Sequence, residues 1–240
     1  MARRPPRFLR LRQVCLVAAD LEREAARLRE ALGVEECHRD PNVAKYGLRN
    51  VLFPVGSGFI EIVSPTGPGT AAGRFLERHG GRHGYMVILD CDDPARYQRR
   101  AEALGIRVAN LIRHGAYFGV QLHPRDTGAA MIEFNHTEGG DDPMGPYAPA
   151  GPDWQRAVRR DVVRRLAAVE IECPDPGALC ARWAELLERS PKKTSKIVLE
   201  AGEIRFLHGR GPEAAFTGVV LEAARPARHE LCGVSFRLAV

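Results

Sequence analysis

The sequence lacks long apolar runs. None of its apolar stretches approaches the roughly 20 residues that a membrane-spanning helix needs, and stretches such as residues 85–89 and 215–221 have the length of strands. The arginine-rich start is not followed by an apolar segment of signal-peptide length, because Asp20, Glu22 and Arg23 interrupt it. These absences predict a cytoplasmic protein with no membrane partner.

Paired cysteines and concentrated basic patches are also missing. The six cysteines form neither a CxxC pair nor a spacing typical of a zinc site. Cys15, Cys91 and Cys173 fall in apolar, strand-like segments, where a reduced cysteine behaves as a small hydrophobic residue. Although the net charge is +5, the arginines alternate with glutamates and aspartates. We therefore expect no disulfide scaffold, no thiol catalysis and no nucleic-acid partner.

What the sequence does contain is a repeat. Three segments share one plan, in which an apolar strand leads to an acidic turn and then to an amphipathic helix. Asp20, Asp92 and Asp175 are the residues that we expect to cap the three helices. Asp20 and Gly33 are separated by the same number of residues as Asp92 and Gly105, and each glycine can end its helix. The strands are expected at residues 14–17, 85–89 and 169–173, and the helices at about 21–32, 94–104 and 177–188.

Short strands separated by turns follow each helix. In the first segment, residues 56–58 (Gly-Ser-Gly) separate two strand patterns, which is typical of a hairpin. Corresponding strands are expected at 119–122 and 130–134 in the second segment, and at 196–200, 204–207 and 217–222 in the third. We therefore predict an α+β fold built from repeated βαβββ modules that form open half-barrel sheets.

A stretch rich in glycine, proline and aspartate, residues 138–154, follows the second module and has the composition of a linker. We accordingly predict a paired βαβββ domain at 8–137, a linker at 138–160 and a third βαβββ-like module at 161–240. Residues 231–240 form a last strand, which either begins an incomplete fourth module or lies at the edge of the third.

Three segments resemble the vicinal oxygen chelate superfamily, which includes glyoxalase I, extradiol dioxygenases and bleomycin-resistance proteins. They are residues 13–21 (QVCLVAADL), 59–65 (FIEIVSP) and 122–134 (LHPRDTGAAMIEF). The last is the most specific and is similar to the closing hairpin of methylmalonyl-CoA epimerase-like and glyoxalase-like members. The resemblance covers residues 8–137 well, and it implies a U-shaped sheet around a cavity.

The resemblance also implies a metal site. In this superfamily the first and last strands of both modules hold a divalent ion that chelates neighbouring oxygens of a substrate. The corresponding positions here are Gln13, Glu61, Tyr85 and Glu133, with histidine usual at the first and third. We predict Gln13, Glu61 and Glu133 as ligands of an ion such as Mg, Mn, Co, Ni or Zn, with His83 as an alternative ligand.

Two functions are consistent with this pattern. The first is an isomerase, lyase or dioxygenase-type enzyme with Glu61 and Glu133 as catalytic carboxylates. The second is a metal-free protein of the bleomycin-resistance type that binds or sequesters a small molecule. In either case Tyr85, His123 and Phe134 are expected to contact the ligand. The missing histidines weigh against glyoxalase I activity and iron-dependent extradiol cleavage. The third module is expected to cover the open sheet or to form a homodimer surface.

Overall fold

The structure, a computed structural model, describes residues 8–240, so residues 1–7 of the arginine-rich start lie outside the described residues.

Aspartates begin the helices that follow the first strand of each repeat. Asp20 accepts a hydrogen bond from the backbone N–H of Arg23 at the start of α1 (Leu21–Leu32). Asp175 accepts one from Ala178 at the start of α5 (Pro176–Leu187). Each carboxylate satisfies a backbone N–H that has no partner inside its helix.

The second repeat is capped one residue later than the sequence analysis expected. Asp93, not Asp92, accepts a hydrogen bond from the backbone N–H of Arg96 at the start of α3 (Pro94–Ala103). The cap lies directly before Pro94 because the fixed φ of proline suits the first position of a helix. The equal intervals between aspartate and glycine therefore do not mark equivalent positions.

The first sheet has seven strands within the described chain, in the order β2-β3-β1-β4-β7-β6-β5. β1 and β4 pair antiparallel at its centre, with β3 parallel to β1 and β7 parallel to β4. The second half, β4-α3-β5-β6-β7, is a complete βαβββ unit, whereas the strand after α1 is reduced to one bridge between His38 and Leu52. The predicted α+β fold of half-barrel modules is confirmed. The other elements of this part are β1 (Leu9–Val17), η1 (Pro41–Tyr46), β2 (Leu48–Val55), β3 (Gly58–Pro65), α2 (Ala71–His79), β4 (Met86–Cys91), β5 (Val108–His114), β6 (Tyr117–Leu122), α4 (Pro124–Thr127) and β7 (Met131–Thr137).

The C-terminal part forms a second sheet, which has six strands among the described residues in the order β12-β13-β11-β8-β10-β9. β11 is antiparallel to β8 and parallel to β13, which repeats the relation of β4 to β1 and β7. β11 therefore begins a fourth, partial module and does not end the third. Only residues 224–226 connect β11 to β12, too few for a helix. The elements are η2 (Ala148–Ala150), η3 (Trp154–Ala157), β8 (Val163–Cys173), β9 (Lys196–Val198), β10 (Glu203–His208), β11 (Ala215–Ala223), β12 (Ala227–Leu231) and β13 (Val234–Ala239).

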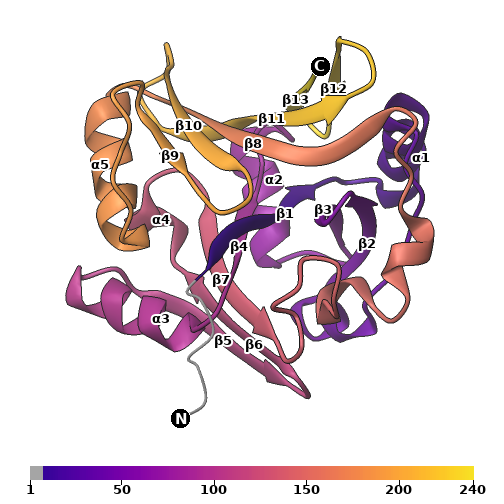
Figure 1. The fold of residues 1–240 in the computed structure, drawn as a ribbon, viewed down its shortest axis with the longest axis horizontal. Coiled ribbons are helices and arrows are strands. Elements are labelled where there is room, and N and C mark those ends of the chain that lie inside the picture. The colour runs from indigo at the N-terminus through magenta and orange to yellow at the C-terminus, as the bar shows by residue number, and fades with distance from the viewer. Residues whose placement is uncertain (1–7) are drawn as a thin grey trace.

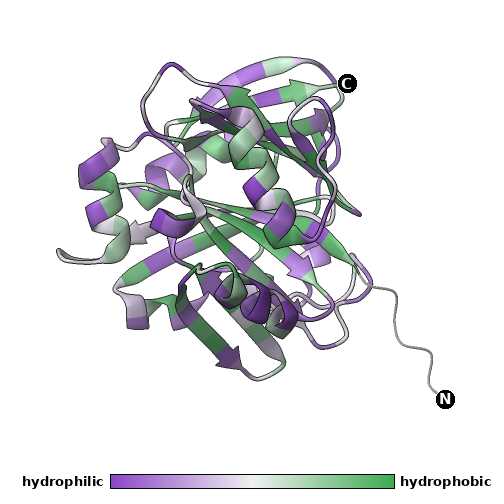
Figure 2. Ribbon diagram, turned by 90° about the vertical axis from the view of Figure 1, so that its left-hand side faces the viewer, coloured by the Kyte–Doolittle hydropathy of each residue, from purple (hydrophilic) through white to green (hydrophobic). Residues whose placement is uncertain are grey.

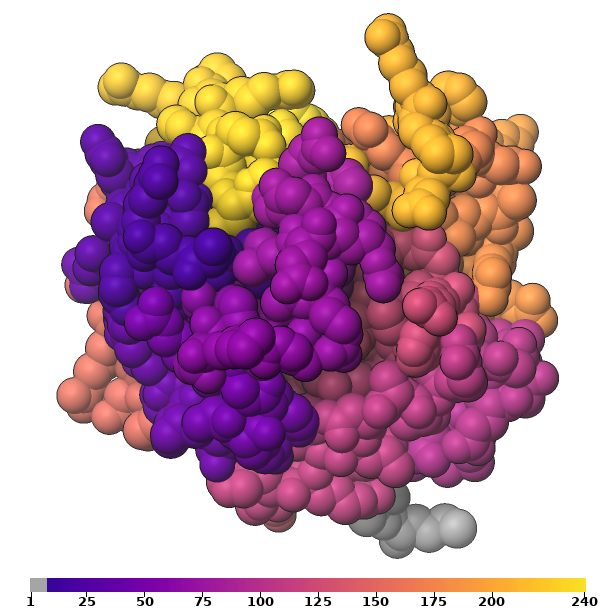
Figure 3. All heavy atoms as spheres, turned by 180° about the vertical axis from the view of Figure 1, so that it is seen from behind, coloured from indigo at the N-terminus to yellow at the C-terminus, as the bar shows by residue number. Residues whose placement is uncertain are grey.

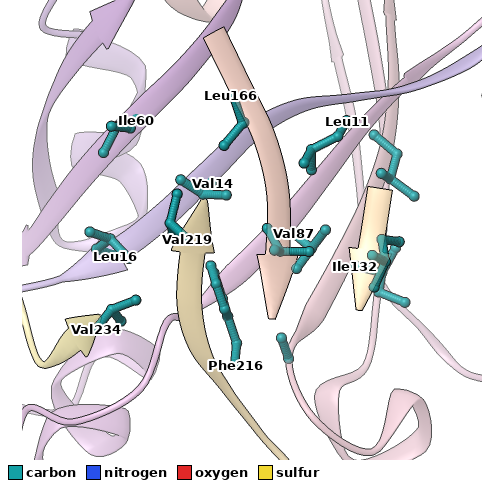
Figure 4. Packing of buried hydrophobic residues seen from close by; sticks show 14 of the residues in the cluster. Leu11, Val14, Leu16, Ile60, Val87, Ile132, Leu166, Phe216, Val219 and Val234 are labelled. Atoms are coloured by element: carbon teal, nitrogen blue, oxygen red, sulfur yellow. The ribbon is translucent and has the colours of Figure 1, made fainter. Parts of the chain in front are cut away.

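The two sheets pack against each other through alternate residues of their strands. The second sheet runs across the top of Figure 1, between α1 and α5. In β1, Val14 and Leu16 belong to the core between the sheets, whereas Cys15 and Val17 belong to a cluster on the opposite face. Figure 4 shows Val219 of the second sheet beside Val14. Burying each such side chain contributes about 1.5–3 kcal/mol relative to leaving it exposed.

Apolar residues are concentrated in the strands, and polar residues are concentrated in helices and turns (Figure 2). In Figure 2 the strands are mostly green, and purple is frequent on helices and turns. Among the helices of residues 8–240, none combines the length and the apolar composition needed to cross a bilayer.

Gly84 lies where the chain enters β4, and it shows how closely the two sheets approach. A Cβ atom added here would overlap the ring of Phe216, which is fully buried. We expect Gly84→Ala to lower the free energy of unfolding by about 1–3 kcal/mol, the usual cost of overpacking a core, as measured by urea denaturation. Gly67→Ala is the matched control, because a Cβ there meets no atom within 4 Å. Equal stability of the two variants would contradict this packing.

Candidate ligand-binding site

A cavity of about 530 Å³ lies on the face of the first sheet opposite to the second sheet. Its floor consists of side chains from alternate strand positions, because residues i and i+2 of a strand share a face. Part of its wall comes from η1 and from residues 147–152. The floor residues are Gln13 and Cys15 from β1, Glu61 and Val63 from β3, Met86 and Ile88 from β4, and Glu133 from β7.

Glu61 is buried and accepts hydrogen bonds from two uncharged amides. Gln13 Nε2 donates to its Oε2 at 2.8 Å, and Asn50 Nδ2 donates to its Oε1 at 2.7 Å. Burial is the largest influence on the pKa of Glu61 and raises it, the hydrogen bond from Asn50 lowers it, and the nearby charge of Glu133 raises it. The net effect is a pKa above the usual value, which favours the protonated form.

Glu133 is held in the same manner on the other side of the sheet's centre. The Tyr117 hydroxyl and Asn135 Nδ2, the latter at 3.0 Å, donate to its Oε1, and Gln121 Nε2 donates to its Oε2 at 2.7 Å. Burial raises the pKa of Tyr117 well above its usual value, so this phenol stays a neutral donor. Neither glutamate has a cationic partner among the described residues.

Tyr147 connects the two carboxylate groups. Its hydroxyl donates to Gln13 Oε1 at 3.0 Å and accepts from Asn135 Nδ2 at 3.3 Å. A continuous series of hydrogen bonds thus leads from Glu61 to Glu133. Tyr147 belongs to the stretch that the sequence analysis assigned to a linker, so this residue was missed. An aromatic side chain between glycines and prolines was the only signal in the sequence.

A buried arginine anchors the segment that carries Tyr147. Arg12 is 1% exposed, its Nη1 donates to the carbonyl oxygen of Pro143 at 2.6 Å, and its guanidinium lies 4.7 Å from the ring centroid of Tyr147. Asp90 forms an ion pair with Arg10 at 2.6 Å and lies 3.9 Å from Arg12 Nε, so its carboxylate offsets part of this buried positive charge. Residues of β1 therefore fix part of the cavity wall.

Four predicted site residues line the cavity. They are Gln13, Glu61, Tyr85 and Glu133, which are far apart in the sequence. Tyr85 lies at the edge, where it also lines a second cavity. Burial raises its pKa to about 12, so Tyr85 stays neutral.

Three other predicted residues are absent from the cavity lining that the structure describes, which corrects the positions expected for them. Phe134 follows Glu133 in β7, so its side chain points to the other face of the sheet. There it stacks on Tyr97, with the two ring centroids 4.3 Å apart. His123 caps the short α4. His83 has a φ of 81° and precedes β4, so it does not share a strand face with Tyr85.

Strand pairing also corrects one expected ligand position. Gln13 pairs with Ile88 and Cys15 pairs with Met86 across the antiparallel centre. The local twofold relation between β1 and β4 therefore places Met86 at the position equivalent to Gln13. Met86 lies seven residues before its helix cap, as Gln13 does. The position at which histidine is usual is thus occupied by Met86 and not by Tyr85.

These residues are a poor set of ligands for the divalent metal that the resemblance implies. Gln13 turns its nitrogen to Glu61, and its oxygen is engaged by Tyr147. The thioether of Met86 is a soft donor that does not suit Mg or Mn. Within residues 8–240, no group of three or more His, Cys, Asp or Glu side chains is arranged to hold a metal ion. The donor set does not fit the expected metal.

The open sheet of paired modules, with a cavity on one face, is the arrangement that the resemblance to the vicinal oxygen chelate superfamily implies. The chain belongs to the family described as glyoxalase-like domain, whose family model matches residues 14–187. The resemblance stated from the sequence is confirmed. Comparison with curated proteins finds no match.

Solved structures of other proteins are similar to this chain to different extents. The alignment with a hypothetical protein from Staphylococcus aureus covers 97% of this chain and 99% of that protein's chain, with a TM-score of 0.72 and 12% sequence identity. A Streptomyces coelicolor methylmalonyl-CoA epimerase in complex with 2-nitronate-propionyl-CoA matches 54% of this chain and 98% of its own, with a TM-score of 0.49 and 20% identity. The Mycobacterium tuberculosis methylmalonyl-CoA epimerase matches 53% and 87%, with a TM-score of 0.47 and 23% identity. The full-length match shows that the two-sheet fold occurs in another protein.

The raised pKa of Glu61 makes stability depend on pH. The folded state holds the proton more tightly than the unfolded state, so the stability from Glu61 is fully present below its ordinary pKa of 4.5 and is lost as the pH rises through the raised pKa. We expect the wild type to lose stability relative to Glu61→Gln as the pH rises from 4.5, measured by urea unfolding across a pH series. Glu30→Gln, on the exposed side of α1, is the control and should follow the wild type. Identical pH profiles for wild type and Glu61→Gln would refute the assignment.

Proposed function

We propose that this glyoxalase-like protein binds a small organic cation in its cavity without a metal. The observation that carries this proposal is the pair of buried carboxylates, Glu61 and Glu133, whose hydrogen-bond donors in the described chain are all uncharged. A buried carboxylate without a positive partner is unfavourable, because burial removes its hydration. A cationic ligand supplies the missing counter-charge.

The size and walls of the cavity support this proposal. Its volume of about 530 Å³ is within the range of about 300–1,000 Å³ that small-molecule sites have. Val63 and Ile88 provide apolar surface, and Tyr117 and Tyr147 provide aromatic rings. A cation beside a tyrosine ring gains about 0.5–2 kcal/mol, depending on its desolvation. This corresponds to the metal-free, bleomycin-resistance type of function.

Calorimetric titration with three probes that share a benzyl group tests the charge preference. We expect benzyltrimethylammonium to bind at least about tenfold more tightly than benzyl alcohol or phenylacetate at pH 8, a difference of about 1.4 kcal/mol. Binding should strengthen as the pH rises through the raised pKa of Glu61, because the cation favours the ionised carboxylate.

The double variant Glu61→Gln/Glu133→Gln should lose the preference for the cation while keeping weak binding of benzyl alcohol. Glu30→Gln again serves as the control and should bind as the wild type does. Equal affinities for the three probes, or tightest binding of phenylacetate, would rule the proposal out.

A proton-transfer enzyme is the second candidate, and the raised pKa of Glu61 beside Glu133 favours it. A carboxyl group that holds its proton can donate it to a bound substrate, which is the kind of acid–base step that the isomerase and lyase predictions require. The dioxygenase prediction has no such support, because the usual facial triad needs two histidines. Metal dependence is tested by adding Mn, Co, Ni or Zn to metal-stripped protein. A rise in Tm that disappears in Glu61→Gln would favour the metal enzyme over the cation-binding protein.

Homodimer formation and cytoplasmic location stay predictions. The second sheet carries ion pairs of Glu170 with Arg205 and Arg237. These charges favour a solvated surface over a large apolar interface, and sedimentation velocity measures the oligomeric state directly.

A further inference from the structure

A second cavity of about 700 Å³ lies beyond Tyr85, outside the site described above. Three segments meet around it: α2, the hairpin of residues 124–131, and residues 212–214, which lead into β11. Figure 3 shows the molecule hollowed between the purple segment that carries α2 and the pink segment of the hairpin. The two cavities share Tyr85 in their linings.

The lining of this second cavity carries more positive than negative charge. Arg78 enters from α2 and Arg125 from the hairpin, and neither forms an ion pair among the described residues. Glu213 is the one carboxylate in the described lining. His79 also contributes, but burial and the neighbouring Arg78 lower its pKa, so it is neutral at pH 7. The described lining therefore contains two guanidinium groups and one carboxylate.

Apolar side chains lie beside these arginines. Phe75 and Tyr85 form an edge contact with their ring centroids 5.0 Å apart, and Met131 lies in the same lining. A flat aromatic or aliphatic group can pack on this surface while an attached anion reaches the arginines, since guanidinium groups match carboxylates and phosphates in geometry.

We propose that this cavity is a second binding site, for a compound that joins an apolar or aromatic body to an anionic group such as a carboxylate or a phosphate. Arg78 and Arg125 provide the counter-charge. The inference goes beyond the proposed function, because it concerns different residues and the opposite ligand charge. It also gives the C-terminal part a role, since residues 212–214 complete the wall of a cavity that the first sheet forms only in part.

Fluorescence titration with a charged and an uncharged probe of similar ring structure tests this site. We expect 8-anilinonaphthalene-1-sulfonate to bind more tightly than N-phenyl-1-naphthylamine. Arg78→Gln and Arg125→Gln should each weaken binding of the sulfonate by about threefold, a loss typical of partly solvated charge pairs, and the double variant by more. Binding of the uncharged probe should not change.

The matched control is Arg156→Gln, which removes an arginine whose side chain is 84% exposed and does not line the cavity. Ala129→Trp fills the cavity and should abolish binding of both probes, provided that circular dichroism and Tm match the wild type. Competition with phenyl phosphate and phenylacetate distinguishes a phosphate site from a carboxylate site. Glu61→Gln/Glu133→Gln should bind the sulfonate as the wild type does, which separates this test from that of the first cavity. Sulfonate binding that is unchanged in the double arginine variant, or that persists in folded Ala129→Trp, would overturn the proposal.

Discussion

The antiparallel pairing of β1 with β4 determines where the polar side chains of the first sheet lie. β3 and β7 flank this pair, and the register places Glu61 beside Cys15 and Glu133 beside Ile88. Because side chains alternate along a strand, a slip of one residue would turn either carboxylate into the core between the sheets. The same antiparallel pairing recurs between β8 and β11. The same kind of strand pair therefore lies within each of the two sheets.

Local sequence signals predicted the repeated part of the fold. A capping aspartate before an amphipathic helix is a property of a few neighbouring residues. The resemblance to the superfamily supplied Glu61 and Glu133 as corresponding positions of the two modules. The error at Asp92 arose because two adjacent aspartates both suit a cap, and only the proline that follows decides between them. That shift of one residue moved an expected ligand from Met86 to Tyr85, because Tyr85 precedes Asp92 by seven residues, as Gln13 precedes the cap Asp20.

Contacts between distant segments could not be predicted in the same way. Tyr147 and Trp154 lie in a stretch of glycines and prolines, yet both are buried against Phe59 of the first sheet. The aromatic rings and Arg12 stabilise this segment through contacts with β1 and β3 that no local pattern encodes. The start of the partial fourth module was misplaced for a related reason: the sequence suggested residues 231–240, whereas the module begins at β11, which is defined by its pairing with β8 and has no following helix to give a repeat signal.

Tyr147 contributes both to the cavity and to the segment that joins the two sheets. Its hydroxyl belongs to the hydrogen bonds between the cavity glutamates, while its backbone continues towards β8 and the second sheet. If the proposed ligand orders Tyr147, it would also stabilise the docking of the segment that leads to β8, and by thermodynamic reciprocity a substitution that loosens this segment would weaken ligand binding by the same free energy. A substitution outside the cavity would then reduce affinity while every residue of the cavity is unchanged.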